Sequence, residues 1–355
     1  MRRSRGHCHD TVTFAPGLQR AVLRMRIEAF SEGKDLDAPR ANEDQFLALP
    51  GRGYAVIDGV TDISGRLYDG MRAGRLASGV VQRAVAKFLA DPAEAEMPPE
   101  RLIARVSADL RAAYERHGML DAARADPSRR FGATLTLAVD LGAAFRFILI
   151  GDSGVRLNGA ELSVVDSGLD LVTATLRRLA FRVVAEAGGG LEDRRRVGRA
   201  CAFHGGAKLH PEMLPWLDDA QRAALYEDSL RECRRLLPGV PEADLRHLLD
   251  TGISGQGRFQ NNTISKLSYA VLDGFDIPMS LIQVFDRPRA SIESIELFTD
   301  GYFKPGAAPA VAAWEAAFAE VERVDPEKIG RYPSVKGTVG RLRTDDRTVV
   351  VVNLS

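Results

Sequence analysis

The chain has 355 residues, of which 45% are hydrophobic and 27% are charged, as in an ordinary globular protein. Its 48 Lys and Arg residues balance 48 Asp and Glu residues, so the formal net charge is zero. A neutral chain has no general attraction to nucleic acid or to an anionic membrane, and any anion site must be local. At this length the chain can bury a large core, as one big domain or two ordinary ones.

The three cysteines, Cys8, Cys201 and Cys233, are too few and too scattered for a disulfide framework, which fits a cytoplasmic protein. The tract His7-Cys8-His9-Asp10 has the residue types of a metal site, but no second ligand cluster accompanies it. We therefore expect a frayed polar end there. The basic N-terminus lacks the apolar segment of a secretory signal, and no apolar run is long enough to cross a bilayer.

The first expected element is a β-hairpin, with strands at 46–49 and 54–57 joined by Pro50-Gly51-Arg52-Gly53. Apolar residues at three- and four-residue spacing then predict one helix over 68–90 and a second over 102–113.

Three period-two segments rich in β-formers predict strands at 134–139, 145–150 and 161–165. Their short turns favour an antiparallel meander, because a parallel crossover needs many more residues.

The later elements expected are helices at 171–186, 211–237 and 307–324 and strands at 291–298 and 347–354. The nearly continuous β-branched run at 347–352 predicts a central strand. No repeat, linker or composition break marks a second domain. We therefore expect one α+β sandwich over 1–355, with 1–39 as an N-terminal extension and first strand, and 168–250 as a helical insertion or flap.

Four short acidic segments are spread along the chain: Asn42-Glu43-Asp44, Ile57-Asp58-Gly59, Thr299-Asp300-Gly301 and Thr344-Asp345-Asp346. In the second and third, an apolar strand ends in an Asp followed by Gly. A buried carboxylate is costly unless a cation meets it, and Gly lets the backbone approach a ligand or ion closely. Several such carboxylates together would make an all-oxygen site for Mg2+ or Mn2+, as in a metal-dependent phosphate-ester hydrolase.

Three further motifs stand between these segments: Gly74-Arg75-Leu76-Ala77-Ser78, Gly132-Ala133-Thr134-Leu135 and Gly151-Asp152-Ser153. A lone Asp-Gly pair is more often a turn, but the whole set in this order resembles the metal-dependent protein phosphatases of type 2C. The resemblance covers roughly residues 40–354 and leaves 168–250 less well accounted for. It implies a four-layer α-β-β-α sandwich of two packed, mainly antiparallel sheets flanked by helices, with two Mn2+ or Mg2+ ions at one end.

The resemblance also implies roles for the matching residues. Asp58 would bridge both ions, Gly59 would supply a backbone carbonyl, and Asp300 and Asp345 would bind one of the ions. Two nearby cations would lower the pKa of a bridging water that attacks phosphorus, and would neutralise charge on the phosphoryl oxygens. No Cys or Ser nucleophile is required.

The acidic pair Glu43 and Asp44 would bind an ion directly or through water, and Asp152 is either a weak ligand or a turn former. Arg40 is the candidate to grip the substrate phosphate with its planar guanidinium. The family's Arg usually stands four residues before the Glu, whereas Arg40 stands three before Glu43, so a solvated loop residue is the alternative.

Lys304 stands where many members carry another Asp that helps to hold a third, weaker ion, which makes a third ion doubtful. We expect Lys304 to be a surface residue, with contact to the substrate phosphate as the alternative. Asp346 is expected to face outward, because adjacent strand residues point to opposite faces. His204 and His210 are expected to be solvated loop residues, since this oxygen-rich site does not call for imidazole.

The leading hypothesis is a Mn2+- or Mg2+-dependent phosphatase of phosphoserine or phosphothreonine in a phosphoprotein, for instance one modified by a partner kinase. A phosphatase of a small phosphorylated metabolite, and a degenerate member that binds a partner without turnover, remain alternatives. The degenerate alternative is opposed by Asp58, Asp300 and Asp345 together, because buried carboxylates without a metal would destabilise the fold. A kinase or nucleotide-binding protein is disfavoured by the lack of a Gly-rich phosphate loop.

Overall fold

The structure is a computed structural model that describes residues 25–61, 65–207, 211, 213 and 215–354. The N-terminal tract His7-Cys8-His9-Asp10 and His210 lie outside these residues. None of the helices in the described part of the chain is long and apolar enough to span a membrane.

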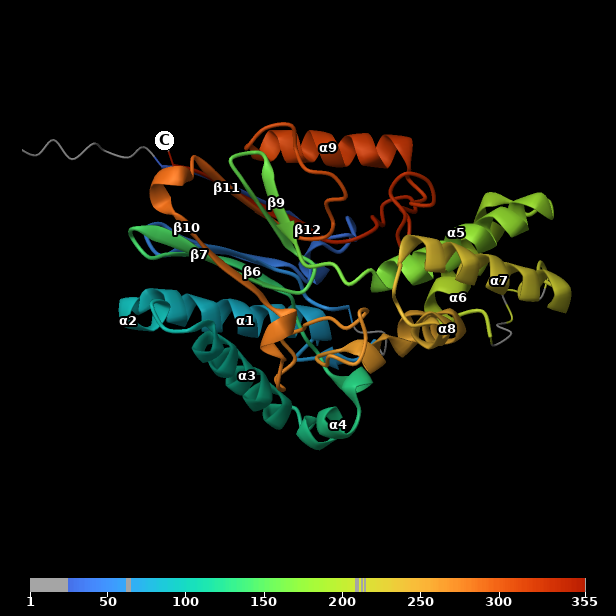
Figure 1. Cartoon of the computed structure of the whole chain (residues 1–355), viewed down its shortest axis with the longest axis horizontal. Helices are drawn as coiled ribbons and strands as arrows, with labels where there is room; N and C mark the ends of the chain where they lie inside the picture. Colours follow the sequence, from blue (N-terminus) through green and yellow to red (C-terminus); the bar gives the residue numbers. More distant parts are fainter. Residues whose placement is uncertain (1–24, 62–64, 208–210, 212, 214, 355) are drawn as a thin grey trace, which may run out of the picture.

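Two five-stranded antiparallel sheets pack face to face at the centre of the molecule (Figure 1). Their strand orders are β1-β12-β11-β8-β9 and β10-β7-β6-β3-β2. The strands of the first sheet are β1 (Arg26–Glu32), β8 (Gly154–Leu157), β9 (Glu161–Val164), β11 (Ser294–Phe298) and β12 (Arg347–Asn353). Those of the second are β2 (Gln45–Leu49), β3 (Gly53–Ile57), β6 (Leu135–Asp140), β7 (Ala144–Ile150) and β10 (Gln283–Pro288).

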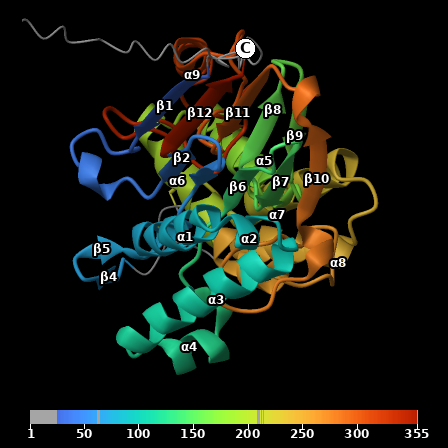
Figure 2. The same cartoon turned by 90° about the vertical axis from the view of Figure 1, so that its left-hand side faces the viewer.

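Helices cover both outer faces of this pair of sheets, which gives the four layers α-β-β-α (Figures 1 and 2). On the second sheet lies α1 (Ala73–Ala90), and α3 (Pro99–Arg116) packs against α1, with the short α2 (Pro92–Ala95) and α4 (Leu120–Ala125) beside them. On the first sheet lies α9 (Val311–Val324). The predicted α+β sandwich is confirmed.

Strand β12 is buried on both of its faces, which explains its continuous run of β-branched residues. Val350 and Val352 lie in the core between the two sheets, whereas Val349 and Val351 pack against Trp314 of α9. Both faces of the strand are therefore buried, as the run predicts. The strand lies between β1 and β11, so the first and last strands of the sandwich are hydrogen-bonded neighbours.

The predicted hairpin is confirmed as β2 and β3, which pair from Leu49 opposite Gly53. The helix predicted over 68–90 begins only at Ala73, as α1. Before it, β4 (Leu67–Tyr68) and β5 (Met71–Arg72) form a small hairpin. The turn residues Asp69 and Gly70 have φ of 50° and 76°, values that a right-handed helix cannot contain.

The predicted meander is wrong. Strands β6 and β7 pair, but the chain then crosses to the other sheet, where β8 pairs with β9 and β11. The crossing occurs at Gly151, whose φ is 87° and where a Cβ would lie 2.5 Å from the Thr134 side chain. Strand β8 was not predicted, because its four residues are too few to show a period. The edge strand β10 was not predicted either.

Four further helices lie beyond one end of the sandwich (Figure 1). They are α5 (Leu169–Glu186), α6 (Leu191–His204), α7 (Asp219–Leu236) and α8 (Glu242–Thr251). They pack around an apolar cluster of their own, which contains the buried thiols of Cys201 and Cys233. Asp218 caps α7, so this helix starts later than the predicted Pro211. His204 is the exposed last residue of α6 and does not lie in a loop.

Arg177 joins these helices to the rest of the molecule. Its buried guanidinium extends from α5, and Nη1 lies 2.8 Å, 3.1 Å and 3.1 Å from the carbonyl oxygens of Glu327, Lys328 and Ser334. This contact fixes the start of the segment that leads from α9 to the last acidic motif.

Candidate functional site

The acidic segments meet at one end of the sandwich, because each stands where a strand begins or ends. Asp58 directly follows β3, Asp300 comes two residues after β11, Asp345 comes two residues before β12, and Asp44 directly precedes β2. The charges of Asp44, Asp152 and Asp345 all act on Asp58, and those of Asp58, Asp152 and Asp345 act on Asp300. The sequence therefore predicted correctly that these carboxylates come together.

Asp44 and Asp58 lie close enough for each carboxyl group to affect the pKa of the other. Burial, followed by the charge of Asp346, raises the pKa of Asp44 to about 8. Burial, followed by the charges of Asp44 and Asp345, raises the pKa of Asp58 well above its ordinary value. Thr299 Oγ1 holds Asp44 in place by donating to Oδ2 at 2.8 Å.

Asp300 and Asp152 are two further carboxyl groups whose pKa values are raised by loss of hydration and by neighbouring carboxylates. Burial and then Asp58 and Asp345 raise the pKa of Asp300 well above its ordinary value. Loss of hydration, with the charges of Asp166 and Asp345, also raises the pKa of Asp152. The side chain of Asp152 is nevertheless open to solvent, so it lies at the edge of the cluster.

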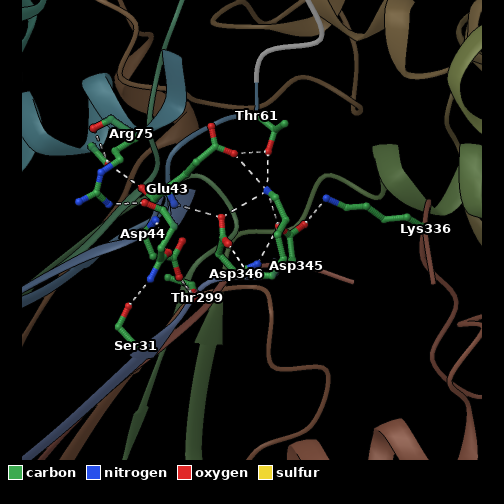
Figure 3. A network of polar contacts seen from close by, with 12 residues as sticks. Ser31, Glu43, Asp44, Thr61, Arg75, Thr299, Lys336, Asp345 and Asp346 are labelled. Carbon is green, nitrogen blue, oxygen red and sulfur yellow. Dashed lines mark hydrogen bonds and ion pairs between the residues drawn. The ribbon is translucent and has the colours of Figure 1, made fainter. Parts of the chain in front are cut away.

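The pKa of Asp345 is lowered, unlike those of the carboxyl groups just described, because two lysines contact it (Figure 3). Lys336 Nζ lies 2.7 Å from Oδ2, and Lys34 Nζ lies 3.2 Å from Oδ1. Burial alone would raise the pKa of Asp345, but the two ammonium groups outweigh it and lower the pKa to about 2. Asp345 is thus a carboxylate at neutral pH.

Lys34 is the principal cation among the carboxylates, and its side chain is only 13% exposed. Its Nζ lies 3.1 Å from Glu43 Oε2, 3.3 Å from Asp346 Oδ2 and 2.9 Å from Thr61 Oγ1, in addition to Asp345. Burial would lower the pKa of Lys34, but the surrounding carboxylates outweigh it and raise the pKa above its ordinary value. Lys34 therefore stays charged.

Asp346 does not face outward, so this prediction is wrong. Its carboxylate is buried and accepts hydrogen bonds from the backbone N–H groups of Lys34 at 2.6 Å and Glu43 at 3.2 Å. The alternation of a strand does not apply at Asp346, because β12 begins only at Arg347. Asp346 ties the N-terminal and C-terminal acidic segments together.

The two Asp-Gly glycines allow neighbouring segments to approach. A Cβ on Gly59 would lie 2.4 Å from the carbonyl oxygen of Gly74 and 2.7 Å from that of Glu43. A Cβ on Gly301 would lie 2.0 Å from the carbonyl oxygen of Asp346. These contacts are too short for any side chain, so both glycines are required for the acidic segments to pack at this end of the sandwich.

The two basic residues singled out from the sequence lie away from these contacts. Arg40 is exposed in the short 3-10 helix Pro39–Ala41. Lys304 forms an ion pair with Glu320 of α9, which places it at the surface, as expected.

The donor atoms of the cluster suit a hard divalent cation. Six carboxyl groups meet two ammonium groups in the described residues: Glu43, Asp44, Asp58, Asp300, Asp345 and Asp346 against Lys34 and Lys336. Glu43 Oε1 and Asp44 Oδ1 are buried and receive no hydrogen bond. Two unsatisfied carboxylate oxygens in a cluster with excess negative charge fit Mn2+ or Mg2+.

Among the residues that the structure describes, no three His, Cys, Asp or Glu side chains are arranged to hold one metal ion. The carboxylates instead contact Lys34, Lys336, Thr61 and Thr299.

Sequence reasoning missed four groups at the site: Lys34, Thr61, Asp170 and Lys336. Loss of hydration, then the charges of Asp152 and Asp166, raises the pKa of Asp170 to about 7, although its side chain is exposed; these charges put the first turn of α5 near the cluster. None of the four stands in a motif of its own. Lys34 stands nine residues before Glu43, in a segment taken as an N-terminal extension.

A separate cavity of about 600 Å³ lies between α3 and the segment after α8. Its wall includes Arg111, Arg130, Arg258 and Phe275, and none of the carboxylates predicted from the sequence lines it.

No protein-family model matches the sequence, and no curated protein is significantly similar to it. Among solved structures, the serine/threonine phosphatase PstP/Ppp of Mycobacterium tuberculosis is 18% identical, with a TM-score of 0.41 over 93% of this chain and 99% of that one. A PstP catalytic domain in complex with two manganese ions is 17% identical, with a TM-score of 0.42 over 93% and 97% of the two chains. PppA of Pseudomonas aeruginosa, a regulatory component of the T6SS, is 14% identical, with a TM-score of 0.40 over 93% and 98%.

PstP is a serine/threonine phosphatase, which is the activity that the motifs of this chain led us to expect. With identities below 20% and TM-scores below 0.5, a functional assignment has to rest on this chain's own residues.

Proposed function

We propose that this chain is a phosphoserine/phosphothreonine protein phosphatase that depends on two Mn2+ or Mg2+ ions, with a phosphoprotein, for instance the product of a partner kinase, as its substrate. The observation that carries the proposal is the convergence of Asp44, Asp58, Asp300 and Asp345 from four separate segments. Buried carboxylates that repel one another are costly in a fold, and cations that they bind in common would remove the cost.

The residues that would hold the ions are those at the centre of the cluster. Asp58 would serve both ions, and the interaction of its charge with those of Asp44 and Asp345 on different segments supports this role. Asp300 and Asp345 would hold one ion, and Glu43, Asp44 and the carbonyl of Gly59 would hold the other. Asp152 would be a weaker ligand at the exposed edge.

Divalent ions held there would supply Lewis acidity, which lowers the pKa of an attacking water and neutralises charge on the phosphoryl oxygens. The other groups orient the ligands: Thr299 fixes Asp44, and Lys336 holds Asp345. Arg40, exposed three residues before Glu43 in the sequence, would bind the substrate phosphate from solvent. Because the pKa values of Asp44 and Asp58 are raised, any proton on these two carboxyl groups would have to leave before both could act as ligands.

The test is hydrolysis of para-nitrophenyl phosphate and of a phosphothreonine peptide by the purified chain in Mn2+, in Mg2+ and in EDTA. We expect metal-dependent turnover that Asp58→Asn abolishes while its circular dichroism spectrum stays that of the parent. Lys304→Met, which alters only a surface ion pair, should keep the parent's rate. Hydrolysis by Asp58→Asn at the parent's rate would contradict the proposal. Preference for the peptide over small phosphate esters would distinguish a protein phosphatase from a metabolite phosphatase.

A second candidate is a phosphatase-like protein that binds a partner without turnover. The position of Lys34 favours it, because an ammonium among Glu43, Asp345 and Asp346 supplies a positive charge that does not depend on metal. No turnover with either metal, in protein that binds Mn2+ by calorimetry, would favour this candidate.

A further inference from the structure

Lys34 is held in the cluster by its backbone as well as by its side chain. It follows β1 and Gly33, and its N–H donates to Asp346 Oδ1 at 2.6 Å. Its ammonium group then lies within 3.3 Å of oxygens from Glu43, Thr61, Asp345 and Asp346. An ammonium group has only three protons to donate, so four oxygens satisfy it completely. These oxygens come from three segments far apart in the sequence, and they surround Nζ as they would surround a bound cation.

The oxygens that Lys34 occupies include two that the proposed function assigns to metal. Lys34 contacts Glu43 Oε2 and Asp345 Oδ1 directly. A divalent ion bound by the same carboxylates would need those lone pairs and would lie close to an ammonium group of like charge. At such separations like charges repel strongly in a partly buried site. The ion and the ammonium group cannot both keep these partners.

We infer that Lys34 is a built-in cation that neutralises Glu43, Asp345 and Asp346 while the site holds no metal, and that a divalent ion must displace it to bind. The inference rests on the proposed function, because it takes the cluster as a metal site. Lys34 then has two opposite effects. It stabilises the metal-free fold, and it weakens the affinity for metal.

The side chain has the freedom that displacement requires. A lysine has a flexible four-carbon stem, and one of the four partners of Lys34, Thr61, is exposed to solvent. Among the described residues, Arg40 forms no ion pair with the three carboxylates that Lys34 contacts, since it is exposed on the 3-10 helix.

The test compares Lys34→Met, which removes the charge at similar length, with Lys34→Arg, which keeps it, and with Lys304→Met as a matched control. Mn2+ affinity is measured by isothermal titration calorimetry, and thermal stability is measured in EDTA. Lys34→Met should bind Mn2+ about tenfold more tightly or better, because a competing charge is gone. Its Tm in EDTA should fall by about 5 °C, because three carboxylates lose their cation. The other two variants should stay within about threefold of the parent's affinity.

Each other outcome is decisive. If the parent binds Mn2+ and Lys34→Met binds it equally or less tightly, the inference is wrong and the metal site stands. If neither binds Mn2+, the proposed function fails together with the inference. If Lys34→Met folds only when Mn2+ is present, the inference is supported, because the metal replaces the ammonium group. If Lys34→Met is unfolded with and without Mn2+, the inference is overturned.

Discussion

At the scale of single residues, the cluster compensates its negative charges in two ways. Asp44, Asp58 and Asp300 lie near one another, and loss of hydration together with mutual repulsion raises the pKa of each, which favours their protonated forms. Asp345 instead has a lowered pKa, because Lys34 and Lys336 contact it. The first three are therefore the carboxyl groups that would exchange a proton for a metal ion.

The raised pKa values predict how the stability of the metal-free protein depends on pH. The pKa of Asp44 is about 8 in the folded chain against 3.8 as its ordinary value, so between these limits the folded state binds more protons than the unfolded state. The free energy of unfolding should then fall as pH rises, on the order of 2 kcal/mol from pH 5 to pH 8. Urea unfolding in EDTA across this range measures it.

Asp44→Asn provides the control for this dependence, since it keeps the size of the side chain and removes one titrating group. The variant should show a shallower fall in unfolding free energy over the same pH range. A parent protein whose unfolding free energy in EDTA rises from pH 5 to pH 8 would contradict the raised pKa of Asp44.

Residue patterns in the sequence predicted the carboxylates but not their cations. Asp58 and Asp300 were predicted because each follows an apolar strand and precedes a Gly, and Asp345 was assigned from the resemblance to the type 2C phosphatases. Lys34 could not be predicted, because its backbone contact with Asp346 spans 312 positions in the sequence. Asp346 was placed on the wrong face because the first residue of β12 could not be located.

At the scale of elements, the start of α1 is packed against the acidic segments. A Cβ on Gly74, the second residue of this helix, would lie 2.7 Å from Glu43 Oε1 and 2.7 Å from the carbonyl oxygens of Gly59 and Val60. Ser78, one turn later, donates to the carbonyl oxygen of Glu43 at 2.5 Å. Helix α1 therefore fixes the position of Glu43.

Two Gly-to-Ala changes in α1 test this packing. Gly79→Ala should raise the unfolding free energy by about 0.5–1 kcal/mol, because its Cβ would meet only the end of the flexible Arg83 side chain. Gly74→Ala should lower it by about 2 kcal/mol, because its Cβ would overlap backbone oxygens. Chemical denaturation of both variants gives the comparison. A stabilised Gly74→Ala protein would show that α1 can move away from Glu43.

Elements were predictable where both faces of a strand or one face of a helix are buried over many residues. Helix α3 and strand β12 are examples. Strand β8 has four residues, and the turn at Asp69-Gly70 interrupts an apolar pattern that otherwise suits a helix. The change of sheet after β7 depends on a left-handed Gly151, which a periodic pattern does not show.

At the scale of the whole molecule, the site forms only when both ends of the described chain come together. Strand β1 pairs with β12 along its full length, from Arg26 opposite Asn353 to Glu32 opposite Arg347. This pairing brings Lys34 and Glu43 next to Asp345 and Asp346. The helices α5–α8 begin beside the same cluster at Asp170, and the sequence predicted them as an insertion without showing that their first turn reaches the site.

The most direct measurement is an anomalous difference map from crystals of the chain grown or soaked in Mn2+. We expect two peaks, both within coordination distance of the Asp58 carboxylate, one of them also bound by Asp300 and Asp345. We also expect Lys34 Nζ to have left Glu43 and Asp345. A map with no peak beside Asp58 in protein saturated with Mn2+, and with Lys34 still in its present position, would contradict both the metal site and the displacement of Lys34.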